Sequence, residues 1–121
     1  MIRLASFLLA LALPAYAAPA ATHPLPWVTG AQLLQQIERP ASQADADAAA
    51  AYLRGVVDAS ADRQWCYSLA KPGTGLMQPA LTDKLRSLGP DQAKESAAVL
   101  AVQAWAAKWP CPQKGCCHAD R

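Results

Sequence analysis

The segment of residues 97–107 constrains the fold most, because Gln103 is its only polar residue. A helix of this composition has no polar face, so it must bury most of its surface against other elements. We expect it to be the central helix of a bundle. No segment alternates apolar and polar residues with the period that marks a half-buried strand. The sequence therefore predicts an all-α fold, a compact bundle of about four to five short helices.

Capping residues and apolar periodicity indicate two helices before this segment. Thr29 and Gln32 have the form of a capping box, and the helix that they begin is expected to end at Pro40. Apolar residues then recur at helical spacing from residue 42 or 45 to about residue 61, which predicts a second helix. Gly55 lies in the middle of that helix, where glycine costs about 1 kcal/mol relative to alanine, so we expect a close helix crossing there.

Glycines and prolines divide the stretch that follows. Residues 68–79, SLAKPGTGLMQP, hold two glycines and two prolines, which is typical of a loop. Pro79 can open a third helix, and Gly89 followed by Pro90 would end it. The fourth helix, which contains residues 97–107, is expected to begin near Asp91.

Residues 1–17 have the pattern of a secretory signal peptide. Arg3 precedes an apolar run, and Ala15 and Ala17 complete an A-x-A cleavage site. An apolar run of about ten residues is too short to span a bilayer, which requires roughly twenty. We therefore expect an exported protein that is cleaved after Ala17 and does not insert into a membrane afterwards.

Cleavage would leave a chain of the length of one small domain. Prolines predict an extended arm for residues 18–28, the helical domain is expected to span residues 29–112, and a polar tail of residues 113–121 follows. Without Arg3, the 11 Lys and Arg become ten, against 9 Asp and Glu. This near balance gives no support for a nucleic-acid partner.

Export also makes disulfides the default expectation for an even number of cysteines. Four cysteines allow three pairings. Cys66 and Cys111 each follow a helix end and a tryptophan, and antiparallel helices would bring them together. We predict a bond between them, which would stabilise the fold by roughly 4 kcal/mol. Cys116 and Cys117 would then oxidise to each other or bridge to a second chain.

The sequence offers little for catalysis. His23 and His118 lie in the two predicted irregular ends, where neighbouring groups cannot orient them. Carboxylates on helix surfaces are usually solvated, and those that could pair as acid and base are Asp58, Asp62, Asp83 and Glu95. We therefore expect a protein that is not an enzyme.

A metal site is an alternative use of the tail. Zinc or copper(I) would find suitable atoms in Cys111, Cys116, Cys117 and His118. Adjacent cysteines are poor chelators, however, and structural zinc sites space their cysteines two to four residues apart. We therefore predict no metal and no cofactor, and we keep a metal carrier as an alternative function.

Four stretches of the chain resemble the Rap/Tai family of immunity proteins: GAQLLQQI, YLRGVVDASADRQWC, LTDKLRSL and SAAVLAVQAWAAKWPCP. The resemblance covers about residues 29–112. Its most specific parts are the pattern of Tyr52, Gly55 and Asp58 that leads to Cys66, and the block of Trp109, Pro110, Cys111 and Pro112.

The resemblance implies a compact, often dimeric helical domain in the periplasm. It also implies that the partner is a peptidoglycan amidase delivered by type VI secretion, whose active-site groove the immunity protein covers. The predicted loop at residues 68–79 would be the inserted segment, with its base fixed by the disulfide. Its candidate contact residues are Lys71, Gly73, Gly75, Leu76 and Met77.

A second function class is a periplasmic holdase, a helical chaperone that exposes apolar surface under stress. Such a protein would bind many unfolded clients, whereas an immunity protein would recognise one effector family. The chain has few carboxylates and only 2 His to act as a pH trigger, which weakens the chaperone alternative.

Overall fold

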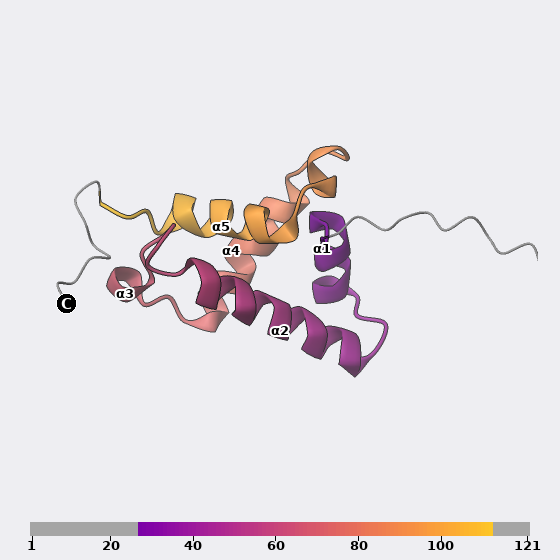
Figure 1. Ribbon diagram of the computed structural model, residues 1–121. Helices are drawn as coiled ribbons and strands as arrows, with labels where there is room; N and C mark the ends of the chain where they lie inside the picture. Colours follow the sequence, from indigo (N-terminus) through magenta and orange to yellow (C-terminus); the bar gives the residue numbers. More distant parts are fainter. Residues whose placement is uncertain (1–26, 113–121) are drawn as a thin grey trace, which may run out of the picture.

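The computed structural model describes residues 27–112 as a bundle of helices (Figure 1). Its elements are α1 (Gly30–Glu38), α2 (Gln43–Ser60), α3 (Tyr67–Ala70), α4 (Thr74–Arg86), the 3-10 helix η1 (Gln92–Lys94) and α5 (Ala97–Lys108). The described residues form no strand, only two isolated bridges. The all-α prediction is therefore confirmed. Within residues 27–112, no helix combines the length and the apolar character needed to cross a membrane.

The central helix of the bundle is α5, as the sequence predicts. It contacts α1, α2 and α4, and its buried residues are Ala97, Leu100, Ala101, Ala104 and Trp105. In Figure 1, α1 lies at one end of the molecule and α3 at the other, with α2 and α5 running between them in the same direction. The prediction that these two helices are antiparallel is therefore wrong. Two cysteines that both follow the C-terminal ends of helices meet most simply when the helices are parallel.

The caps of α1 and α2 follow the sequence prediction. The Thr29 N–H donates to the Gln32 side chain at 2.9 Å, and the Gln32 N–H donates back to the Thr29 hydroxyl at 3.2 Å. Of the two predicted starts for α2, Ser42 is the N-cap, because its hydroxyl accepts a hydrogen bond from the Asp45 N–H. Each cap satisfies an N–H group that the first helical turn leaves free.

The predicted loop at residues 68–79 is wrong over most of its length. Residues 67–70 form the short helix α3, and α4 begins at Thr74, so that Pro79 lies inside α4 instead of opening it. Pro79 forfeits one helical hydrogen bond near the N-terminus of α4. Burial of the neighbouring Met77 and Leu81 offsets that loss, because both side chains are in the core.

The start of α5 also lies later than predicted. Near the predicted start at Asp91 the chain forms η1, and α5 begins at Ala97. The reason is a non-local contact with the segment before α1: the Gly30 N–H donates to the Glu95 carbonyl at 3.0 Å, and the Ala97 N–H donates to the Val28 carbonyl at 2.8 Å. These bonds hold Glu95 in an extended conformation between η1 and α5.

The close backbone approach is at Gly30 and not at Gly55, where the sequence predicts it. A Cβ atom at Gly55 would have no atom within 4 Å, apart from its own helix. At Gly30 a Cβ atom would lie 2.6 Å from Leu100 Cδ1 and 3.2 Å from Leu85 Cδ2. The first residue of α1 therefore packs closely against side chains of α4 and α5.

The two glycines provide a matched pair of alanine substitutions. Gly55→Ala is expected to raise the free energy of unfolding by roughly 0.5–1 kcal/mol, because it adds helix propensity and meets no neighbour. Gly30→Ala is expected to lower it by about 1–3 kcal/mol, because the buried Leu100 side chain must shift within a packed core to make room for the added methyl group. Urea denaturation of both variants checks the pair. A destabilising Gly55→Ala would mean that the added methyl group does meet a neighbour, against the open space found at Gly55.

Candidate functional site

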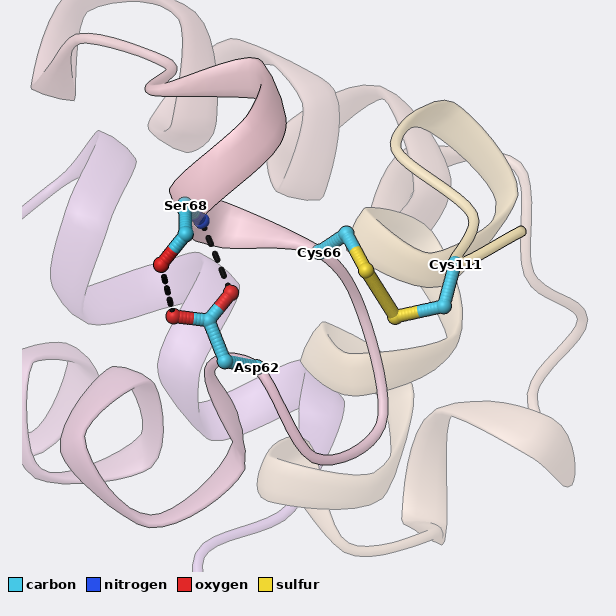
Figure 2. Close-up of a disulfide and its surroundings, with 4 residues drawn as sticks. All are labelled: Asp62, Cys66, Ser68 and Cys111. Carbon is cyan, nitrogen blue, oxygen red and sulfur yellow. Dashed lines mark hydrogen bonds between the residues drawn. A yellow bond between two sulfur atoms is a disulfide. The ribbon is translucent and has the colours of Figure 1, made fainter. Parts of the chain in front are cut away.

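The candidate site is the connection between α2 and α4, residues 61–73, which we call the α3 loop. A disulfide joins Cys66 in this loop to Cys111 beyond the end of α5, with the two Cα atoms 4.9 Å apart (Figure 2). The Cys66 N–H also donates to the Trp109 carbonyl at 3.1 Å. The predicted pairing of Cys66 with Cys111 is therefore confirmed. A covalent bond and a backbone hydrogen bond fasten the middle of the loop to the end of α5.

A second fastening lies beside the disulfide. Asp62 has a left-handed backbone, with φ of 57°, which turns the chain sharply after α2. Its carboxylate accepts one hydrogen bond from the Ser68 N–H at 2.7 Å and another from the Ser68 hydroxyl (Figure 2). The Ser68 hydroxyl and then the Ser68 N–H hold the pKa of Asp62 below its ordinary value, because both bonds favour the charged carboxylate. This Asp62–Ser68 contact holds the start of the loop against the first turn of α3.

The Asp62–Ser68 contact predicts a specific pH dependence. Because the pKa of Asp62 is lowered in the folded state, its charged carboxylate adds to the free energy of unfolding. This contribution is fully present above the ordinary pKa of 3.8 and is lost as the pH falls through the lower, folded-state pKa. We expect the Ser68 amide resonance to stay constant from neutral pH to about 4 and to shift only below that.

The variant Asp62→Asn tests this prediction, because asparagine tolerates the left-handed backbone but carries no charge. In that variant the Ser68 amide shift is expected to lose its acid transition. Asp58→Asn, at an exposed carboxylate of α2, should leave the transition in place. A Ser68 amide that titrates equally in both variants would contradict the role of Asp62.

Aromatic rings form a rigid base under the loop. Trp65 is fully buried, and its ring centroid lies 5.2 Å from that of Trp105 and 6.0 Å from that of Trp109. Its indole N–H donates to the Ser60 hydroxyl at 2.9 Å, which in turn donates to a backbone carbonyl of α2. Tyr67 packs edge-on against Trp65 at 5.7 Å. The loop is therefore built on packed and hydrogen-bonded side chains from α2 and α5.

The structure separates the candidate contact residues of the sequence analysis. Lys71 is exposed and has a left-handed backbone with φ of 42°. Gly73 caps α4, Gly75 lies in its first turn, and Leu76 is 58% exposed. Met77 is only 8% exposed and belongs to the core, so it offers a partner little surface. The other four lie on or next to the α3 loop.

Two exposed apolar side chains of the loop were missed by sequence reasoning. Tyr67 is partly exposed and Leu69 is 63% exposed, both on α3. A helix of four residues has too few positions to show periodicity, so the sequence gives no signal for it. Beside α3 lies a hollow of about 350 Å³ between α2 and α4, lined in part by Arg54, Tyr67 and Pro72.

The residues of the family-like patterns have different surroundings. Trp109 packs on the core, whereas Pro110 is exposed next to the disulfide. Tyr52 packs on the core with part of its surface accessible, and Asp58 is exposed on α2. Tyr52 also lines a mainly apolar groove of about 640 Å³ between α2 and α5, together with Gly55.

The residues considered for catalysis do not come together. Asp62 is engaged by Ser68, and Asp83 lies 3.8 Å from Arg86. Among residues 27–112, no three His, Cys, Asp or Glu side chains are placed to hold a metal ion. Cys111 is bonded to Cys66 and thereby leaves the suggested metal-ligand set. Its other members, Cys116, Cys117 and His118, lie outside the described residues, as does His23.

The α3 loop, held by the disulfide and by Asp62, exposes apolar and cationic side chains. Residues 29–111 match the family of Rap1a immunity proteins, over a range that contains all five α-helices and both bonded cysteines. No curated protein matches the chain. The family match covers well over half of the sequence, and the fold contains the disulfide that the sequence predicts. The chain belongs to the Rap1a immunity protein family.

Proposed function

We propose that this immunity protein acts in the periplasm, where it binds and blocks a peptidoglycan amidase delivered by type VI secretion. Membership of the Rap1a immunity family makes a toxin effector the partner. The disulfide between Cys66 and Cys111 is the observation that supports an extracytoplasmic site of action, because such bonds persist in oxidising compartments. The signal-peptide pattern of residues 1–17 agrees with it. Peptidoglycan lies in that same compartment, so a toxin that cleaves it would be met there.

The proposed mechanism is exclusion of substrate by the α3 loop. Two fastenings, Cys66–Cys111 and Asp62–Ser68, hold the loop before the partner arrives. A loop that is already ordered loses less conformational entropy on binding than a flexible one. Tyr67 and Leu69 project apolar surface that can enter a cleft of the effector, with Lys71 and Leu76 next to them. Inhibition then needs no chemistry from the immunity protein itself.

The direct test is protection of cells that export an amidase effector. The full chain is expected to prevent lysis, and the purified protein without residues 1–17 is expected to inhibit peptidoglycan hydrolysis in vitro. As a matched control, the same shortened chain kept in the cytoplasm should not protect. The proposal is overturned if no amidase of a type VI effector panel is bound or inhibited. A general suppression of aggregation of denatured proteins would instead support a holdase.

We also propose that the groove between α2 and α5 is the contact face of a homodimer. It is lined mostly by small and apolar residues, including Gly55 and Val102, and Val99 at its edge is half exposed. Sedimentation of the purified protein tests this. Val99→Glu should shift a dimer to monomer, whereas Leu69→Glu on α3 should not. A wild-type protein that remains monomeric at millimolar concentration would refute the dimer.

A further inference from the structure

Charged side chains are distributed unevenly along the bundle. Residues 27–112 contain eight Lys and Arg and eight Asp and Glu, so this part of the chain is neutral overall. Its three ion pairs are Arg86–Glu38, Arg86–Asp83 and Lys94–Asp91. All of these residues belong to α1, to the C-terminal end of α4 or to the segment around η1, at the end of the molecule away from α3 (Figure 1).

The end that carries the α3 loop has an excess of positive charge. Arg63 and Lys71 belong to the loop, Arg54 lines the hollow beside it, and Lys108 is the last residue of α5. All four are exposed, and none forms an ion pair with a residue of the described range. The acidic residues at this end are Asp58 and Asp62.

The balance at this end is therefore four cations against two carboxylates, of which Asp62 is engaged by Ser68. The rest of the described range has the opposite excess, with the remaining four cations against six carboxylates. The neutral domain thus has a positive end at α3 and a negative end at α1.

Exposed apolar side chains gather at the same positive end. Of the five large hydrophobic residues that are exposed in the described range, three lie on the α3 loop or in the first turn of α4: Tyr67, Leu69 and Leu76. Apolar residues at the centre of a surface with charged residues around them are the usual composition of a protein-binding patch.

We propose that the α3 end binds a protein surface with an apolar cleft and a rim rich in Asp and Glu. Complementary charge steers association and selects partners, while the apolar side chains supply the buried contact. A net excess of two charges is small for a phosphate polymer or an anionic membrane, which bind through larger basic clusters. The proposal rests on the proposed function in that the partner is the toxin effector. It adds the electrostatic character of the effector's docking site.

The first test does not require the effector. The mature chain is titrated with a capped peptide of alternating Leu and Glu, and backbone amide shifts are followed by NMR. Shifts are expected in residues 62–76 and should be absent for the same peptide with Lys in place of Glu. Shifts centred on α1, or equal responses to both peptides, would overturn the proposal. Tighter binding to phosphatidylglycerol vesicles than to the Glu peptide would overturn it too, because the end would then be a lipid-contact surface.

The second test uses an amidase effector that the protein inhibits. The double variant Arg63→Glu and Lys71→Glu is expected to lower the association rate constant about tenfold at low salt, and the difference should shrink in high salt. Its matched control is Arg39→Glu with Lys84→Glu, the same charge change at the C-cap of α1 and on α4, which should change the rate less than twofold. Equal effects of the two double variants on a bound effector would refute the charge assignment and leave the proposed function standing. If no effector is inhibited, the proposed function fails, and the peptide titration still decides the inference.

Discussion

Replacing both Cys66 and Cys111 with alanine is expected to lower the free energy of unfolding by about 4 kcal/mol. The disulfide joins residues that are 45 positions apart, and a loop of that length removes roughly this much conformational free energy from the unfolded chain. Small domains are stable by only about 5–15 kcal/mol, so the loss would bring this one close to its limit. Urea denaturation of the purified double variant measures the change.

Reduction of the wild-type protein is the matched comparison for this variant. A reducing agent should lower its stability by a similar amount and should not change the double variant. Cys116→Ala with Cys117→Ala serves as a control, because it leaves the Cys66–Cys111 bond in place. If the wild type and the variant without Cys66 and Cys111 had the same midpoint of unfolding under oxidising conditions, the bond would contribute little.

Local sequence patterns predict the helices that depend on local interactions. The capping box of Thr29 and Gln32 fixes the start of α1 because both partners lie within one helical turn. Ser42 caps α2 for the same reason. The apolar segment at residues 97–107 becomes the central helix because its composition leaves no face for water.

The wrong starts of α4 and α5 and the misplaced close approach all concern contacts between distant residues. The glycines and prolines of residues 68–79 favour a loop locally, but burial of Met77 and Leu81 against the bundle makes residues 74–79 helical. The predicted close crossing at Gly55 is wrong for the same reason, because a glycine in a helix does not reveal which residues pack opposite it. At Gly30 the neighbours are Leu85 and Leu100, far away in the sequence.

Of the candidate site, only the disulfide could be predicted from the sequence. Two cysteines after two predicted helix ends are visible in the sequence, and their pairing is confirmed. The Asp62–Ser68 contact is not visible, because it depends on the left-handed backbone of Asp62 and on the short helix α3. The positive end is also hidden, because the helix directions decide which charges lie together.

Trp65→Ala is expected to lower the free energy of unfolding by about 3–5 kcal/mol, the range measured when a buried aromatic side chain is truncated. Trp65 is fully buried between α2 and α5, and its ring lies against those of Trp105 and Trp109. Its loss would leave a cavity under the α3 loop and remove the hydrogen bond that the indole N–H donates to the Ser60 hydroxyl. Urea denaturation followed by circular dichroism measures the change.

Two further variants separate the effect of burying the Trp65 ring from the effect of losing any tryptophan and from the effect of its hydrogen bond. Trp27→Ala removes a ring that is 45% exposed and its hydrogen bond to the Lys94 carbonyl, and should cost only about 1 kcal/mol. Trp65→Phe keeps most of the ring volume but loses the bond to Ser60, so its effect should lie between the other two. A Trp65→Ala variant as stable as Trp27→Ala would mean that the loop does not depend on the aromatic base. In that case the disulfide and Asp62 alone would have to hold the loop for binding.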